Sequence, residues 1–249
     1  MFIFTLSIPG EEHLIIQTSA YQYIKQRKTF SGIRTNKNFD MSTTYFKIDS
    51  TDEGGYPQVE CDCVPIMQLI SPWKLHKENF CSLEFTLKKK TVLTDLLSTT
   101  AGPYIDLLIS EKFKNAICQC NIMSHQYFKA VVNSPKGPQP YFFLHLCQPN
   151  LVDFIDYQTS IFFETEWGFY KCPILINSYE HYLSLKSNAN TVSFGIEIER
   201  LAMTENFDRS IDMFYILQFD NSIYISERMK KIIEENKITG IKFLDEITI

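Results

Sequence analysis

Two pairs of cysteines have a spacing that could serve metal binding. Cys61 and Cys63 stand two residues apart, as do Cys118 and Cys120. In a helix, side chains at i and i+2 point to different sides, so Cys118 and Cys120 are poorly placed to share one ion. Zinc sites combine such a pair with a matching second pair, and no histidine pair lies near Cys61 and Cys63. We therefore expect ordinary reduced thiols, with no metal and no cofactor.

Carboxylates and histidine offer a second kind of chemistry, general acid–base catalysis. Asp153 with Asp156, and Glu197 with Glu199, form close acidic pairs, and His145 lies inside an apolar run. The glutamates alternate with isoleucines, which is typical of the solvated face of a strand. The sequence contains no Gly-x-Ser-x-Gly, His-Glu-x-x-His or Walker pattern. We expect no catalytic residue; the alternative is a small cytosolic enzyme built on Asp153, Asp156 and His145.

Charge and composition restrict the class of partner. The 249 residues include 24 Lys and Arg against 29 Asp and Glu, a net charge of −5, and the acidic excess falls after His125. Nucleic-acid binding needs clustered basic residues, so we expect that this protein does not bind nucleic acid. Seven cysteines, an odd number, and a short apolar start ending at Pro9 predict a cytoplasmic protein without a signal peptide. No apolar run approaches the roughly 20 residues that cross a bilayer, so we expect no membrane association.

The elements that position these side chains are mostly strands. Short runs of branched and aromatic residues without regular strand–helix alternation predict an α+β fold, with a mostly antiparallel sheet and few short helices. The expected strands include Phe2–Ile8, Leu14–Gln17, Thr44–Ile48, Ser82–Leu87, Pro140–Cys147, Val152–Tyr157, Ser160–Glu164 and Thr191–Glu199. We expect residues 1–249 to form one compact unit, with a subdivision into a β-rich part, 1–100, and a core, 101–249.

An internal repeat is the clearest pattern in the sequence. Residues 107–127 and 223–243 align without gaps at an offset of 116, with Ile, Ser, Glu, Lys, Ile and Ile identical. Each segment runs from a short apolar strand into an amphipathic helix and then into a second strand. We therefore expect two pseudo-repeated strand–helix–strand units.

Each repeat contains signals for a helix start. Ser110 and Ser226 precede the two helices and are suited to accept a hydrogen bond from an otherwise unpaired amide. Glu111 and Glu227 follow in the first turn, where negative charge suits the helix dipole. The second helix is predicted to end near Asn236.

Acidic and aromatic side chains in polar segments are candidates for partner contact. A large aromatic beside carboxylates is a common anchor of protein interfaces. The candidates are Glu164, Glu166, Trp167, Glu205, Asp208 and Asp212. Two interpretations stay open for each segment: simple solubility, which is the commoner reason for such residues, and contact with a basic partner.

The closing stretch, residues 224–243, resembles the C-terminal signature of a bacterial immunity-protein family. The genes of this family lie beside those of secreted polymorphic toxins, and the family was first catalogued as a domain of unknown function. Its pattern is a strand, Ser-Glu-Arg-Leu-Lys, a short helix, and Thr-Gly-hydrophobic-x-Phe. The chain keeps Ser226, Glu227, Arg228, Lys230, Thr239, Gly240 and Phe243. Met229 replaces the usual leucine, which conserves volume.

Two further segments are similar to the same family. Thr94–Ser98 leading to Ile109–Phe113 resembles its central block, and Asp153–Ser160 resembles the strand region that follows. These motifs are caps, turns and packing positions, so no toxin-contacting residue carries over. The resemblance implies tight non-covalent binding of a cognate toxin encoded by the adjacent gene, with no reaction catalysed. Besides the enzyme, a structural or regulatory interaction module is the other alternative.

Overall fold

The computed structural model describes most of the chain beyond residue 42. The described residues are 43–51, 57–61, 71, 73–76, 83–99, 107–147, 151–189 and 193–249. The expected strands Phe2–Ile8 and Leu14–Gln17 lie outside them. The chain divides into one unit of residues 1–41 and one of residues 42–249, and every described residue belongs to the second. A subdivision near residue 100 stays a prediction.

The largest sheet has six strands in the order β2-β3-β6-β7-β5-β4. Their bounds are β2 (Val59–Cys61), β3 (Leu83–Leu87), β4 (Leu96–Leu97), β5 (Leu107–Ser110), β6 (His125–Ser134) and β7 (Gly137–Leu146). Neighbouring strands are antiparallel except β3 and β6, which are parallel. The long β6–β7 hairpin turns at Gly137, whose φ of 101° is open to glycine.

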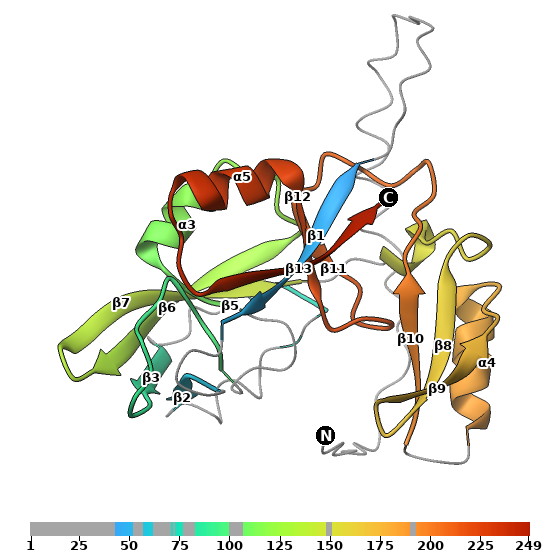
Figure 1. Ribbon diagram of the computed structural model, residues 1–249, viewed down its shortest axis with the longest axis horizontal. Helices are drawn as coiled ribbons and strands as arrows, with labels where there is room; N and C mark the ends of the chain where they lie inside the picture. Colours follow the sequence, from blue (N-terminus) through green and yellow to red (C-terminus); the bar gives the residue numbers. More distant parts are fainter. Residues whose placement is uncertain are drawn as a thin grey trace, which may run out of the picture. The chain divides into compact units, whose positions relative to one another are not determined.

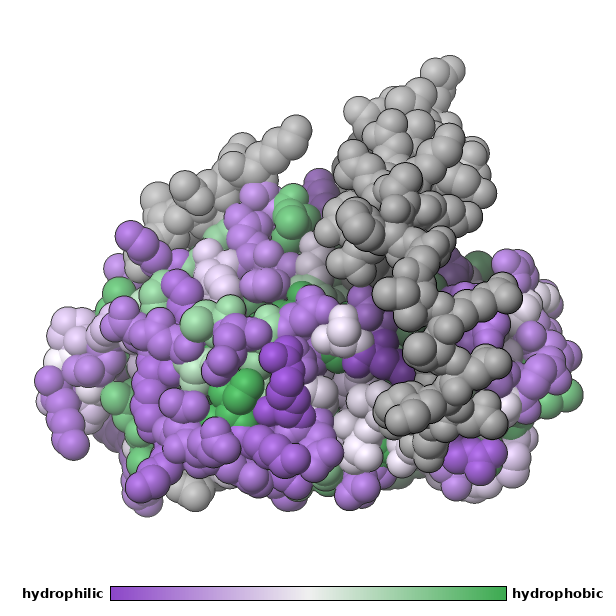
Figure 2. Space-filling model, turned by 90° about the horizontal axis from the view of Figure 1, so that it is seen from above, coloured by the Kyte–Doolittle hydropathy of each residue, from purple (hydrophilic) through white to green (hydrophobic). Residues whose placement is uncertain are grey.

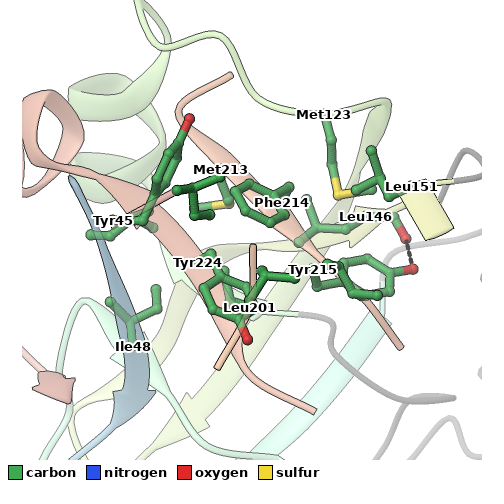
Figure 3. Packing of buried hydrophobic residues seen from close by; sticks show 14 of the residues in the cluster. Tyr45, Ile48, Met123, Leu146, Leu151, Leu201, Met213, Phe214, Tyr215 and Tyr224 are labelled. Carbon is green, nitrogen blue, oxygen red and sulfur yellow. Dashed lines mark hydrogen bonds between the residues drawn. The ribbon is translucent and has the colours of Figure 1, made fainter. Parts of the chain in front are cut away.

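A second sheet has four antiparallel strands in the order β11-β12-β1-β13. Their bounds are β1 (Thr44–Ser50), β11 (Met213–Tyr215), β12 (Ile223–Ser226) and β13 (Ile241–Thr248). Aromatic rings fill its core. The ring of Phe214 meets that of Tyr45 edge to face, with 5.2 Å between centroids, and stacks on that of Tyr224, with 5.1 Å between centroids. Figure 3 shows this packing. It also shows the hydrogen bond that the Tyr215 hydroxyl donates to the Leu146 carbonyl oxygen at 3.1 Å, which links this sheet to β7.

Two helices lie side by side, α3 (Glu111–Ile117) and α5 (Glu227–Glu235), and they contact each other (Figure 1). The stripe of α3 that is buried consists of Phe113, Ala116 and Ile117. In α5 the buried side chains are Met229 and Ile233. Both expected strand–helix–strand segments therefore have the expected local structure, and the cap of α5 is Asn236.

The third sheet has the order β10-β8-β9 and is also antiparallel. Its elements, with the helix that precedes β10, are β8 (Ile161–Glu166), β9 (Phe169–Ile174), α4 (Tyr179–Asn188) and β10 (Phe194–Arg200). Tyr182 of α4 is buried and packs its ring against Phe219 at 4.6 Å. The described residues are thus mostly β, with three short α-helices, which agrees with the expected α+β class.

One expected strand is wrong. Residues 151–154 form a 3₁₀ helix, Leu151–Phe154, where the sequence predicts a strand from Val152 to Tyr157. The carboxylate of Asp156 accepts the amides of Gln158 and Thr159 at 3.0 and 3.3 Å. Such local bonding gives the backbone an alternative to a sheet ladder, and the apolar run turns instead of extending.

Candidate functional site

The start of α5 is held by a buried aspartate. The Ser226 hydroxyl accepts the amide of Met229 at 3.1 Å and donates to Asp212 Oδ1 at 2.6 Å. Arg228 pairs with the same carboxylate, and its Nε lies 3.0 Å from Oδ1. Asp212 Oδ2 also accepts the amide of Asn121 at 2.6 Å. The carboxylate therefore joins the cap of α5 to the chain that follows α3.

Asp212 is one of the residues for which the sequence predicts a partner contact. The residue is only 3% exposed, and both carboxylate oxygens accept hydrogen bonds within the chain. A buried carboxylate with these partners supports the fold and is not available at the surface. We therefore assign Asp212 a structural role.

A matching arrangement holds the start of α3. The Ser110 hydroxyl accepts the amide of Phe113 at 3.1 Å and donates to Asp95 Oδ1 at 2.7 Å. Asp95 Oδ2 accepts from the amide and the hydroxyl of Thr239, both at 2.9 Å, and from Lys112 Nζ at 3.3 Å. Burial alone would raise the pKa of Asp95, but the hydrogen bonds from Ser110, Thr239 and Lys112 outweigh it and hold this pKa below its usual value.

Each of the two aspartates links one strand–helix–strand unit to the other. Asp95 binds the cap of α3 and the residue Thr239 after α5, whereas Asp212 binds the cap of α5 and the residue Asn121 after α3. Gly240 follows Thr239 with a φ of 84°, and a Cβ there would lie 2.3 Å from the Leu96 carbonyl oxygen. Glycine is required at this position both for its backbone angle and for this close approach.

Lysines cover aromatic rings at equivalent places on the two helices. Lys230 Nζ lies 3.8 Å from the centroid of Phe46 and 5.2 Å from that of Phe243. Lys114 Nζ lies 3.7 Å from the centroid of Phe142. These are cation–π contacts. Together with the hydrogen bonds of the serines and aspartates and the close packing at Gly240, they show that the signature residues connect elements of the fold.

Figure 2 views the molecule from the side on which α3 and α5 lie in Figure 1. The described residues seen on this face are mainly hydrophilic, with hydrophobic residues among them. On α5 the exposed side chains include Glu227 and Lys231, which pair at 2.9 Å. An exposed pair of this kind contributes little to stability or to specific recognition.

Two of the groups considered for catalysis, His145 and Asp156, make contacts in different parts of the fold. His145 is fully buried in β7, with Nε2 3.3 Å from the Lys74 carbonyl and its ring near those of His76 and Phe128. Asp156 serves its local turn, where its Oδ2 also accepts the Thr159 hydroxyl at 2.8 Å. Within the described ranges, no three or more His, Cys, Asp or Glu side chains are grouped to hold a metal ion.

The acidic and aromatic candidates lie in two surface segments. Glu164 and Glu166 belong to β8, and Trp167 lies in the turn between β8 and β9. Glu164 pairs with Lys171 at 2.6 Å. Around Trp167 the chain exposes further aromatic residues of β9, which sequence reasoning missed because it predicted no strand there.

Glu205 and Asp208 lie in the connection between β10 and β11, and both are exposed. Asp208 accepts the amide and the hydroxyl of Ser210 at 3.0 and 2.6 Å. This segment therefore presents charge without a large aromatic anchor.

Fold and motif geometry together define an α+β protein whose signature residues join two strand–helix–strand units. The model of the Immunity protein family (Imm11) matches residues 21–247, and the chain belongs to this family. The match confirms the resemblance seen in the C-terminal signature and extends it toward the N-terminus. A comparison with curated proteins finds no match. Of the helices described, none has the length and apolar character needed to cross a membrane.

Proposed function

We propose that this chain neutralises a cognate toxin by tight non-covalent binding and catalyses no reaction. The observation that carries the proposal is membership of an immunity protein family, which implies a toxin as partner. The signature residues Ser226 and Arg228 bond Asp212 and so hold α5 in the fold that the family shares. The toxin is the product of the adjacent gene, and the pair meets in the cytoplasm.

The surface proposed for toxin contact contains the acidic and aromatic candidates that remain exposed or half-buried. These are Glu164, Glu166, Trp167, Glu205 and Asp208. An acidic surface favours a toxin with a basic binding face, because complementary charge accelerates association. Asp212 is left out because its carboxylate is occupied within the fold.

We also infer that the two strand–helix–strand units are copies of one ancestral unit. Strands β6-β7-β5-β4 and β13-β1-β12-β11 have the same order and the same antiparallel neighbours around the two units. The serine, aspartate and lysine contacts recur in both. A duplication explains the shared chain order β4-β5-α3-β6 and β11-β12-α5-β13, whereas β1, in the place of β7, comes from a segment far before the second unit.

Co-expression with the neighbouring gene product tests the proposed function. The neighbour is expressed in a host cell with this protein or with an empty vector, and the two products are then co-purified by size exclusion. We expect restored growth together with a stable complex. Growth restored without any complex contradicts binding and favours an enzyme that removes the toxin's product. A harmless neighbour that fails to co-purify contradicts the proposal altogether.

A further inference from the structure

The β8–β9 hairpin ends in aromatic side chains that the fold leaves in solvent. Trp167 is 75% exposed, Phe169 77% and Tyr170 61%. We call these three residues and Glu166 the hairpin tip. Large aromatic side chains normally contribute to stability through burial, so Trp167 and Phe169 give the fold little, while the ring centroid of Tyr170 lies 5.3 Å from that of Phe163. Exposed apolar groups of this kind mark sites of interaction.

The backbone at the tip is also strained. Glu166 pairs with Phe169 across a two-residue loop in which Trp167 has a φ of 56° and Gly168 a φ of 80°. Positive φ at both central residues is the geometry of a type I′ turn, for which Asn and Gly are preferred. A tryptophan at the first of these positions disfavours the fold and gains no burial in return. Strain of this kind at an exposed residue points to a function outside the fold.

Charge around the hairpin indicates the chemistry of the partner. Residues 151–212 hold ten acidic residues against four basic ones, a net charge of −6, while the whole chain carries −5; one of the ten, the buried Asp212, is paired with Arg228 outside this segment. The rest of the chain is therefore slightly basic. Glu164 is neutralised by Lys171, but Glu166 forms no ion pair within the part of the chain that the structure describes. A basic partner fits this segment.

The same features disfavour a second copy of this chain as the occupant. Two copies would bring together segments of net charge −6 each, which repel. Strand β9 is an edge strand, but Pro173 lacks an N–H group and the ladder shifts register between Glu164 and Thr165. Both features hinder the addition of another strand. Side chains at the tip, and not ladder hydrogen bonds, are then the means of contact.

We propose that the hairpin tip docks a basic segment of the toxin. Lysine or arginine side chains of that segment lie over the rings of Trp167 and Phe169, and one pairs with Glu166, which is the cross-strand partner of Phe169. Trp167 is the central anchor. This inference rests on the proposed toxin binding and assigns the surface that performs it.

The decisive variant is Trp167→Asn, tested against the purified product of the adjacent gene. Asn is favoured at this turn position, so the variant should fold at least as stably as the wild type in urea. We expect its affinity for the toxin to fall about 30-fold, as for an interface hot spot. The matched control is Trp73→Asn, because Trp73 is 55% exposed and lies outside the hairpin. This control should bind like the wild type.

Fluorescence gives a second, direct measurement. The chain has two tryptophans, so Trp73→Phe leaves Trp167 as the sole indole. On addition of the toxin its emission should shift to shorter wavelength as the indole leaves water. In Trp167→Phe, the emission of Trp73 should stay unchanged. If the Trp167 emission does not move while a complex forms, the docking surface is overturned.

The outcomes separate the two proposals. If the wild type neither protects the host nor binds the neighbouring product, toxin neutralisation fails and this inference fails with it. If the wild type does both and Trp167→Asn binds within about twofold of it, only the hairpin tip is excluded. Should Trp167→Asn fold poorly, Phe169→Thr replaces it, because threonine is favoured in an exposed strand. Unchanged binding by that variant likewise overturns the proposal.

Discussion

Asp95 and Asp212 join parts of the chain that lie far apart in sequence. Each accepts the hydroxyl of a helix-capping serine, and each also binds the residue that follows the other helix. Hydrogen bonds to a charged carboxylate are stronger than those between neutral groups. Single side chains therefore hold α3 and α5 in their relative position.

Replacing Asp95 by asparagine should destabilise the protein by about 1–2 kcal/mol at neutral pH, because charge-assisted hydrogen bonds become neutral ones. The pKa of Asp95 lies below that of the unfolded chain, about 3.9, so its contribution is complete above this pH. It is lost as pH falls through the lowered pKa. Urea unfolding of both proteins at several pH values should show the difference shrinking below about pH 4. A difference that stays constant with pH would exclude this role.

At the scale of elements, the serine caps stabilise the start of each helix and also bind an aspartate from a distant part of the chain. Ser226 caps α5 and also bonds the buried Asp212, whereas Ser110 caps α3 and bonds Asp95, which is more solvated. Loss of a hydroxyl leaves a buried acceptor partly unsatisfied, and this costs more than loss of a cap alone. Replacing each serine therefore measures the same kind of hydrogen-bonded cap, once beside a buried carboxylate and once beside a more solvated one.

We expect Ser226→Ala to lower the free energy of unfolding by about 2–3 kcal/mol, the sum of a cap and a buried charge-assisted bond. Ser110→Ala should cost about 1–2 kcal/mol, because water replaces part of the lost bond to Asp95. Urea titration monitored by circular dichroism measures both. Equal losses would mean that the burial of Asp212 adds nothing to the cap.

Gly240 lies where α5 returns to β13, and its role is conformational. We expect Gly240→Ala to destabilise the protein by about 2–3 kcal/mol, since alanine disfavours a φ of 84° and its Cβ would clash with the Leu96 carbonyl. Chemical denaturation is the measurement. Gly137→Ala is the control: its φ is also positive, but no atom lies within 4 Å of the added Cβ, so its loss should be smaller.

At the scale of the whole molecule, charge is unevenly distributed along the chain. The acidic excess lies in residues 151–212, which contain the β8–β9–β10 sheet and α4. The helices α3 and α5 and the two other sheets carry the structural signature of the family. The proposed recognition surface on the β8–β9 hairpin and the C-terminal signature thus lie in different parts of the sequence, while Asp212 of the acidic segment belongs to the joint at α5.

The proposed binding should depend on ionic strength. Raising salt from about 0.01 M to about 1 M shortens the Debye length from about 30 Å to about 3 Å. We expect the association rate with the toxin to fall at least about tenfold, with a smaller change in dissociation. Surface plasmon resonance at several salt concentrations measures both rates. A salt-independent association rate would contradict attraction between an acidic segment and a basic partner.

Sequence reasoning found the strands that alternate or carry dense apolar runs, such as Ser82–Leu87, and it found Ser110 and Ser226 as helix starts. Among the described elements it missed the short strands β2 and β4, strand β9 and helix α4. Residues 169–173 of β9 are all exposed and only Ile174 is half-buried. The strand therefore has no buried face, and its sequence lacks the alternation of apolar and polar residues that predicts a strand. The apolar residues of α4 give only a weak stripe, with Tyr182 its one buried residue.

The sequence by itself determined the local features of this protein: the class of fold, the two capped helices and the family signature. These depend on residues a few positions apart, whose spacing is visible in one dimension. Only the tertiary structure decided that β1 lies between β12 and β13, that Asp95 meets Thr239 and that Asp212 is buried. It also decided that Trp167 stands in solvent. Each of these depends on contacts between distant segments, because burial and register belong to the assembled chain.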